Sequence, residues 1–470
     1  MQMTSRPSSI LKSFLFLIIT TLLFTQCSEE EIVPDEPVED IAISATSTSD
    51  CGCTYTVPVS TNTVTVDGSK LGIKPGAVIC LKGGATYKNI IFKNIRGTAT
   101  SPVTIKNCGG IATIKATGTY FAIKTQLSSN IRITGGTGTT YGIKIIGGHH
   151  SITLEYLTTD VEVDHIEVGY SGFSGIMAKT DPSCDNATIR GNFTMRNVFL
   201  HDNYVHDTAG EGFYVGHTFW NTGMKLSCGT RYPHAMENVK IYNNIVKNAG
   251  WEAIQVGSTP TGAEVYGNRI ENYGTKNKLY QNNGVQFGEG APGKFYNNYI
   301  KGGKGSALVI IGNPDNFIYN NVIVNAGVDG IFCEDRSTGI GFRIINNTII
   351  NPGANGIKLY SEMVNMNNVY NNIVVNPGSY SKYTYPRTGN DAYVYLLDKR
   401  VKIQSANNYF TRDINAVKFA GVSTGNYQLT STSPAFNKGF NIATFGIQQD
   451  HAQKPRLSRL TYDIGAFELQ

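Results

Sequence analysis

A short pattern recurs along the middle of the chain. An alternating apolar run ends in a pair of polar turn residues, most often Asn-Asn, and a second apolar run follows directly. The second residue of this pair is always asparagine, and it recurs in steps of 23 to 30 residues at Asn244, Asn268, Asn298, Asn321, Asn347 and Asn372. An earlier copy contains Asn203. A repeat of this length is typical of a solenoid, in which each repeat buries its apolar face only against its neighbours.

Each copy continues into another short alternating run, such as Gly212–Gly216 and Gly284–Gly288. No helical pattern separates these runs, so we predict an all-β fold in which the repeats form the coils of a parallel β-helix. Asparagine at a fixed turn suits left-handed backbone geometry, and its side chain can stack as a ladder between coils. We therefore expect one elongated domain, rather than the three domains that a length of 470 residues would otherwise suggest.

Strand alternation orients the side chains of each coil. In Gly212–Gly216, Phe213 and Val215 should point inward and Tyr214 outward. Aligned copies then give one outward column: Met177, Tyr214, Gln255, Gln286, Val309, Phe332 and Lys358. A second outward column lies two residues on: Lys179, Gly216, Gly257, Gly288, Ile311, Glu334 and Tyr360. The glycines would leave a floor beside Tyr214 that suits an extended glycan.

A third column precedes these strands: Ser174, Glu211, Glu252, Asn283, Ser306, Asp329 and Asn355. The two-residue alternation, which we call parity, would by itself bury this column. Its charged members instead lead us to expect an exposed turn. Because neighbouring coils lie about 4.8 Å apart, Glu211 and Glu252 would have the carboxylate separation of about 5 Å that a retaining glycosidase needs. The alternative is a solvated pair, or caps for turn amides.

One coil carries an insertion, at about residues 217–238, that contains Trp220, Arg231, Tyr232 and His234. Long insertions on solenoids cluster on the binding face. Trp220 offers a flat surface to a sugar ring, Arg231 pairs well with carboxylates, and His217 or Tyr214 could act as base or acid. The alternative is a surface loop whose aromatic residues only cover the coil.

The remaining candidates for substrate binding are Lys179, Gln255, Gln286, Glu334 and Arg336. The segment Glu334-Asp335-Arg336 could bind an ion or a uronate, or it could be a solvated cluster that pairs with itself. We predict no metal site, because paired Cys-x-x-Cys and His-x-x-x-His spacings are missing. The sequence requires no cofactor, and Ca²⁺ is the only ion that we consider.

The first 50 residues have the features of a targeting segment. Residues 1–26 carry two basic residues and an apolar run from Ile10 to Phe24, which is the pattern of a secretory signal peptide. The signal ends at Cys27, which we expect to be lipidated, although an ordinary cleaved signal with an incidental cysteine is the alternative. Residues 27–50 are acidic near the start and read as a flexible tether.

Charge distinguishes the tether from the folded part. The chain has 40 basic and 35 acidic residues, and residues 1–40 contain 2 and 7 of these, which leaves +10 for residues 41–470. A basic extracellular domain favours anionic partners. We favour an acidic polysaccharide over nucleic acid, because no nucleic-acid-binding motif or arginine-rich cluster is present.

Seven cysteines follow Cys27. Outside the cell we expect Cys51 and Cys53 to pair with Cys80 or Cys108, in an order that the sequence leaves open, and Cys184 to pair with Cys228. Cys333 lies in an apolar strand pattern and should be a buried thiol.

Both ends of the repeat region carry further motifs. The segment Lys74-Pro-Gly-Ala-Val-Ile-Cys-Leu near the start, and Asp463-Ile-Gly-Ala-Phe-Glu468 near the end, resemble the corresponding parts of the pectin-lyase-like superfamily. The resemblance spans roughly residues 54–470. It implies a right-handed parallel β-helix over residues 51–470, with a cap at about 51–105, regular coils at about 106–410 and a tail at about 411–470.

Relatives of this kind include polysaccharide lyases of the alginate lyase and chondroitinase B types. The segment Glu252–Ser258 resembles part of the chondroitinase B motif, but Gln255 replaces its arginine and the next coil lacks its lysine. The paired aspartates and Gly-His-Gly of polygalacturonase-type hydrolases are not found. The acidic run after Cys27 resembles the surface-export signal of Bacteroidetes lipoproteins.

These observations predict a lipoprotein of the outer membrane, exposed at the cell surface, monomeric, and attached to the membrane only through its lipid. It would process an extracellular acidic glycan as a lyase or a glycoside hydrolase, which the sequence does not separate. The alternatives are a non-catalytic glycan-binding or adhesion protein, and a structural surface protein.

Overall fold

The computed structural model describes residues 51–136, 141–378, 392–397, 399–456 and 461–470. The predicted signal peptide, Cys27 and the tether lie outside these residues. The described residues form one compact unit. Among the described residues, no helix is long and apolar enough to span a membrane.

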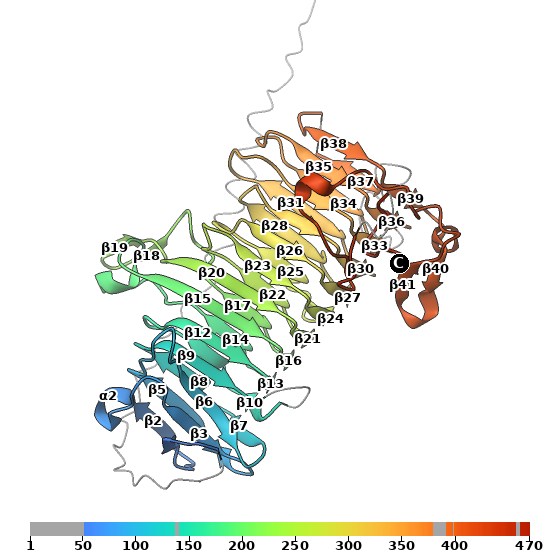
Figure 1. The fold of residues 1–470 in the computed structure, drawn as a ribbon. Coiled ribbons are helices and arrows are strands. Elements are labelled where there is room, and N and C mark those ends of the chain that lie inside the picture. The colour runs from blue at the N-terminus through green and yellow to red at the C-terminus, as the bar shows by residue number, and fades with distance from the viewer. Residues whose placement is uncertain (1–50, 137–140, 379–391, 398, 457–460) are drawn as a thin grey trace, which may run out of the picture. The chain divides into compact units, whose positions relative to one another are not determined.

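The described chain winds through three parallel sheets, one strand of each per regular coil (Figure 1). Sheet A consists of β1 (Tyr55–Thr56), β3 (Val78–Lys82), β6 (Val103–Cys108), β9 (Ser129–Thr134), β12 (Thr159–Asp164), β15 (Thr194–His201), β20 (Ala235–Tyr242), β23 (Ala263–Tyr266), β26 (Gly293–Tyr296), β29 (Phe317–Tyr319), β32 (Arg343–Ile345), β35 (Asn367–Tyr370) and β38 (Ile403–Ala406).

Sheet B consists of β2 (Thr63–Asp67), β5 (Asn89–Lys93), β8 (Phe121–Gln126), β11 (His150–Leu154), β14 (Ile176–Ala178), β17 (Phe213–Val215), β22 (Ile254–Val256), β25 (Val285–Phe287), β28 (Leu308–Gly312), β31 (Ile331–Asp335), β34 (Ile357–Tyr360) and β37 (Val394–Leu396).

Sheet C consists of β4 (Thr86–Tyr87), β7 (Ala112–Ala116), β10 (Ile143–Gly147), β13 (Ile166–Gly169), β16 (Tyr204–His206), β21 (Ile245–Lys247), β24 (Arg269–Tyr273), β27 (Tyr299–Gly303), β30 (Val322–Val324), β33 (Thr348–Ile350), β36 (Ile373–Val375) and β39 (Tyr409–Thr411). The predicted parallel β-helix is confirmed, and its first strands already lie within the segment predicted as a cap.

The remaining elements lie outside the three parallel sheets. They are the helix α2 (Gly68–Leu71), the antiparallel pairs β18 (Met224–Leu226) with β19 (Gly229–Arg231) and β40 (Phe419–Gly421) with β41 (Asn426–Leu429), and the 3₁₀ turns η2 (Asn186–Thr188), η4 (Ile414–Val417), η5 (Val422–Thr424) and η6 (Ala443–Phe445).

Inward side chains of the three sheets stack into one hydrophobic core. In sheet A, for example, Ile241, Val265, Phe295 and Ile318 occupy successive coils at the same register. All four are buried, and burial of such a side chain contributes about 1.5–3 kcal/mol.

The predicted asparagine ladder is confirmed, and the two residues of each turn pair have different roles. The second residue is buried, and its Nδ2 donates to Oδ1 of the next coil's asparagine, as from Asn268 to Asn298 at 3.0 Å. The same Oδ1 accepts the backbone N–H of Asn268. The first residue adopts the left-handed conformation, as at Asn297 with φ 55°.

Disulfides connect Cys51 with Cys108, Cys53 with Cys80 and Cys184 with Cys228. This confirms the Cys184–Cys228 prediction and settles the order that the sequence left open. Cys333 is a buried free thiol, as expected.

The C-terminal tail packs against the last coils through two small apolar clusters. Its charged motif residues are buried and bonded to one another. Arg456 forms an ion pair with Glu468 at 3.0 Å and also donates to the Asn320 side chain in a coil turn. Asp463 accepts the backbone N–H groups of Asn437 and Leu469. These buried contacts therefore hold the C-terminal tail against the coils of the β-helix.

Candidate functional site

The outward face of sheet B has the register that alternation predicts. Strand pairing aligns Met177, Tyr214, Gln255, Gln286, Val309, Phe332 and Lys358 on successive coils. Gln255 and Gln286 point away from the core and are nevertheless buried, as is Met177. The centre of this face is therefore recessed between neighbouring segments.

Lys179, Asp181 and His217 lie together beside Tyr214. Lys179 is 4% exposed, and its Nζ lies 2.5 Å from Oδ1 of Asp181 and 4.8 Å from the ring centroid of Tyr214. The Asp181 side chain is 34% exposed, so this ion pair reaches the surface. Burial raises the pKa of Asp181, but the charge of Lys179 more than offsets this, and the net pKa lies below the ordinary value. Asp181 is thus an ionised carboxylate.

His217 is a neutral imidazole with a defined tautomer. Its Nδ1 accepts the backbone N–H of Phe219, so the proton is on Nε2, which faces Oδ1 of Asp181 at 3.4 Å. Burial and the nearby Lys179 lower the pKa of His217 to about 3. His234 is neutral in the same way, because Nε2 accepts from Thr180 and Nδ1 donates to Ala235.

The hydroxyl of Tyr214 is hydrogen-bonded to Thr218 at 3.1 Å, and Gln255 Nε2 donates to the same Thr218 oxygen. Burial raises the pKa of Tyr214, and the charge of Lys179 opposes this rise without cancelling it. The phenol is therefore protonated at neutral pH. It can donate a hydrogen bond, and its conversion to phenolate is favoured by the adjacent ammonium group.

Glu211 and Glu252 are buried, 2% and 0% exposed, and the prediction of an exposed turn is wrong. The third column follows parity and lies inside the coil. Its polar members bond along the column, as from Asn355 Nδ2 to Asp329 Oδ1 at 2.6 Å. Asp329 and Asn355 can occupy these inward positions because each supplies a hydrogen-bond partner to the other from the neighbouring coil.

Burial raises the pKa of Glu211 to about 7. Burial and the neighbouring Glu211 raise the pKa of Glu252 well above its ordinary value, and Asn283 opposes the rise in part. Neither oxygen of Glu252 makes a well-formed hydrogen bond within the described chain. Glu252 is therefore protonated at neutral pH, Glu211 is close to half protonated, and both are shielded from solvent, so the pair cannot reach a glycosidic bond in this conformation. A catalytic role for it stays a prediction.

Three oxygens of this pair, on Glu211 and Glu252, make no hydrogen bond within the described chain, but the pair does not fit Ca²⁺. Calcium takes six to eight oxygen ligands, and carboxyl groups that are shielded from solvent and wholly or partly protonated offer neither the full negative charge nor access to the water ligands that would complete the shell.

A row of aromatic rings borders the recess, on the turns that enter sheet B. The ring of His149 stacks on Tyr120 and on Phe173, with centroids 5.4 Å apart in both pairs. Phe173 meets Trp251 edge-on at 4.9 Å across Gly210, whose lack of a side chain leaves room for the contact. Lys278 Nζ lies 3.4 Å from the ring centroid of Trp251. Sequence analysis missed this row, although Phe173, Gly210 and Trp251 each directly precede a residue of the third column and so share one register position.

The predicted insertion is present between β17 and β20, and its Trp220 does not present free ring faces. The guanidinium of Arg190 lies 3.4 Å from the Trp220 ring centroid, and the ring packs against Gly290. Trp220 therefore anchors the insertion. Arg231 lines an open pocket with Tyr232.

Glu334 and Arg336 lie four coils from Tyr214, which corresponds to about 19 Å. Arg336 lies 3.8 Å from Glu334 and 3.7 Å from Glu289, so this cluster is largely self-paired. Only a glycan of several residues could contact both regions.

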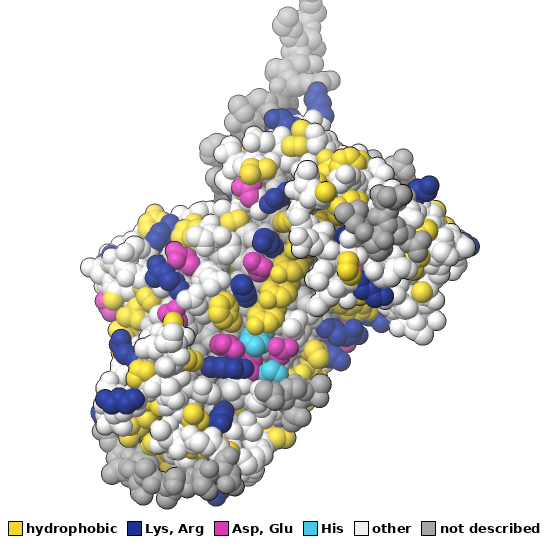
Figure 2. All heavy atoms as spheres, viewed as in Figure 1, with side chains coloured by type: hydrophobic (Ala, Val, Ile, Leu, Met, Phe, Trp, Pro, Cys, Tyr) yellow, Lys and Arg dark blue, Asp and Glu magenta, His cyan; other side chains and the backbone are white. Residues whose placement is uncertain are grey.

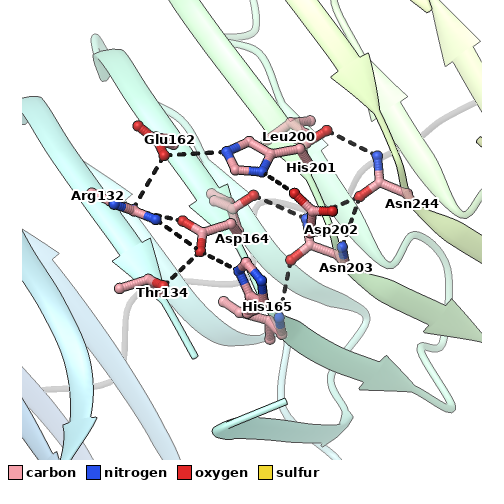
Figure 3. Close-up of polar contacts among 12 residues, drawn as sticks. Arg132, Thr134, Glu162, Asp164, His165, Leu200, His201, Asp202, Asn203 and Asn244 are labelled. Carbon is pink, nitrogen blue, oxygen red and sulfur yellow. Dashed lines mark hydrogen bonds and ion pairs between the residues drawn. The ribbon is translucent and has the colours of Figure 1, made fainter. Parts of the chain in front are cut away.

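Sheet A carries a second polar cluster on its outward face (Figure 3). Arg132 bonds Asp164 at 2.8 Å and Glu162 at 3.2 Å, and His201 Nε2 lies 3.1 Å from Glu162. The oxygens of the two acids and a His201 nitrogen lie within 4.8 Å of one another, but both carboxylates already form ion pairs with Arg132. From His201 a stack of rings runs along the sheet: Tyr242, Tyr266, Tyr296 and Tyr319. In Figure 2 a hydrophobic band ends at such a group of acidic, basic and histidine side chains.

Comparison with known proteins identifies the fold. The family model described as a right-handed β-helix region matches residues 234–410. No curated protein matches the chain. The described chain is thus a right-handed parallel β-helix.

Among solved structures, the chain is similar to an alginate lyase from Paenibacillus sp. str. FPU-7, with 19% identity, TM-score 0.41, and coverage of 65% of this chain and 100% of the lyase. It is similar to pectate lyase Pel9A, with 14% identity, TM-score 0.47, and coverage of 88% and 98%. It is also similar to the GH136 lacto-N-biosidase from Eubacterium ramulus, with 13% identity, TM-score 0.44, and coverage of 72% and 62%.

Proposed function

We propose that this right-handed β-helix protein cleaves an acidic polysaccharide by β-elimination on the outward face of sheet B. The observation that carries the proposal is the position of Lys179 beside Tyr214, in a recess bordered by aromatic rings. The solved structures with similar folds include an alginate lyase and a pectate lyase, and the +10 charge of residues 41–470 favours an anionic substrate.

In this mechanism Tyr214 transfers the proton. Its phenolate removes the hydrogen at C5 of a uronate, and the electron pair forms the C4=C5 double bond as the C4–O bond breaks. The Tyr214 hydroxyl then returns the proton to the departing oxygen, so the residue ends as it began. Lys179 favours the phenolate and the negative charge that develops on the uronate carboxylate. The products are a new reducing end and an unsaturated uronate.

Elimination is favoured over hydrolysis by the state of the carboxyl groups. A retaining hydrolase needs two carboxyl groups that flank the scissile bond, and Glu211 and Glu252 are shielded within the coil. Tyr214, in contrast, is only half-buried and lies on the outward face.

A non-catalytic glycan-binding protein is the second candidate function. The observation that favours it is that Lys179 and both ring nitrogens of His217 already have partners within the protein. Such a surface could recognise a glycan by stacking and ionic contacts alone.

The experiment incubates the purified protein with a panel of acidic and neutral polysaccharides and follows unsaturated-uronate absorbance and reducing ends together. Both signals support the lyase, and reducing ends alone support a hydrolase. Binding without either product supports the second candidate.

We also propose that the protein is a cell-surface lipoprotein of the outer membrane, lipidated at Cys27. The support is the signal sequence and the acidic segment after it. Metabolic labelling with a fatty-acid analogue should mark the protein, and Cys27→Ser should abolish the label.

A further inference from the structure

Two neighbouring insertions form one cross-linked flap, which we define as residues 179–193 and 216–234. Cys184 of the first is bonded to Cys228 of the second. Ile189 pairs with Pro233 in a β-bridge, and Arg190 N–H donates to the Tyr232 carbonyl. The flap is therefore held in one conformation, and it also carries Asp181 and His217 of the Tyr214 site.

The flap contains an open pocket of about 370 Å³, lined by Ile189, Arg190, Thr230, Arg231 and Tyr232. Arg190 is fixed there, because its guanidinium lies between the rings of Trp220 and Tyr232 and donates to the Pro233 carbonyl at 3.3 Å. Nε of Arg231 contacts Cys228 Sγ at 3.4 Å. Tyr232 is 43% exposed.

Both guanidinium groups lack an acidic partner. Within the described part of the chain, no carboxylate lies at ion-pair distance from Arg190 or Arg231, whereas most arginines of the coils are paired, as Arg132 and Arg196 are. Two unneutralised arginines that converge on one pocket create a site for an anion. A guanidinium matches a planar carboxylate with two parallel hydrogen bonds, and the exposed Tyr232 ring offers an apolar surface for a sugar.

We propose that this pocket binds the carboxylate of a uronic acid residue, as a second subsite on the flap, outside the Tyr214 site. The inference rests on the proposed function for the identity of the ligand, since the bound residue belongs to the same acidic polysaccharide. Because the disulfide and the β-bridge join the two insertions, occupancy of this pocket places the glycan relative to Asp181 and His217.

The test measures binding rather than turnover. The purified protein with Tyr214→Phe, which prevents cleavage, is titrated calorimetrically with tetrasaccharides of galacturonate, glucuronate and mannuronate, and with a neutral glucose tetrasaccharide. Arg231→Ala should increase the Kd of the tightest-binding uronate tetrasaccharide about tenfold. Arg231→Lys keeps the charge but loses the paired hydrogen bonds, so it should also weaken binding, by several-fold.

Lys225→Ala is the matched control, because it removes the same charge from an exposed position on the same hairpin. It should leave the Kd within about twofold. The proposal is overturned if Arg231→Ala and Lys225→Ala have equal effects, if the neutral tetrasaccharide binds as tightly, or if no uronate binds. Absence of cleavage by the unsubstituted protein, with Arg231-dependent binding retained, would instead refute only the lyase.

Discussion

The ammonium group of Lys179 lies 4.8 Å from the ring centroid of Tyr214, on the outward side of sheet B. If this pair performs proton transfer, Tyr214→Phe should reduce kcat by at least about 10³-fold, because no neighbouring group replaces the hydroxyl. The Kd for a uronate oligosaccharide should change by less than about threefold, since the ring is retained. Unchanged kcat in this variant would remove Tyr214 from the mechanism.

The pH dependence of activity should follow the same residue. Burial raises the pKa of Tyr214 above its ordinary value, so the phenolate fraction, and with it kcat/KM, should increase tenfold per pH unit from neutral into the alkaline range. The pKa of His217 is about 3, so the titration of His217 does not change the activity between pH 5 and 8. A stopped assay over pH 5–10 measures this profile. A bell-shaped pH–activity profile centred below pH 7 would indicate that carboxyl groups transfer the proton instead.

Glu252→Gln should stabilise the protein at alkaline pH. The folded protein holds the Glu252 proton more tightly than the unfolded chain, whose pKa is near 4.5. Stability is therefore full below that value and falls as the pH rises toward the raised pKa of the folded state. Glutamine cannot ionise, so Tm at pH 8 should increase by about 2 °C or more, with little change at pH 4.

Glu237→Gln is the control for this change, since Glu237 forms an exposed ion pair with Arg196 and should alter Tm by less than a degree in either direction. A lower Tm at pH 8 for Glu252→Gln would contradict the account in which Glu252 is protonated in the folded protein.

The asparagine ladder gives a second stability prediction. Asn298→Ala removes the acceptor for the N–H and the Nδ2 of Asn268, and removes the donor to Val265, all in the buried interior. Unfolding free energy in urea should fall by about 2–4 kcal/mol. The neighbouring Asn297→Gly should change it by less than about 1 kcal/mol, because glycine adopts the same left-handed backbone. Equal losses would mean that the turn, not the ladder, is what stabilises the coil.

The sequence was sufficient for those parts of the fold that repeat. The positions that Asn244 and Tyr214 occupy recur once in each regular coil, so the ladder and the outward column could be placed by counting. Two-residue alternation then determines which side chains face outward, whatever their chemistry.

Charge misled the prediction at Glu211 and Glu252. Parity placed them inside, and their ionisable groups argued for an exposed turn, but burial shifts their pKa values so that they need not be charged. Parity was the stronger signal, because reversing it would have displaced the apolar residues of β17 and β22 from the core.

Asp181 and Arg190 could not be assigned from the pattern, because they lie in an insertion of irregular length between β14 and β15. Their positions depend on which segments meet across the coils, as when Cys184 joins Cys228. The only available signal was the pair of cysteines in two consecutive insertions, which indicated that these segments are neighbours.

The most direct test of the account is the absorbance of unsaturated uronate when the purified protein acts on acidic polysaccharides at pH 8–9. The account predicts that absorbance rises together with new reducing ends for at least one polyuronate, and that Tyr214→Phe abolishes both. Reducing ends without absorbance, or a folded protein that binds a polyuronate and never releases product, would contradict elimination at Tyr214.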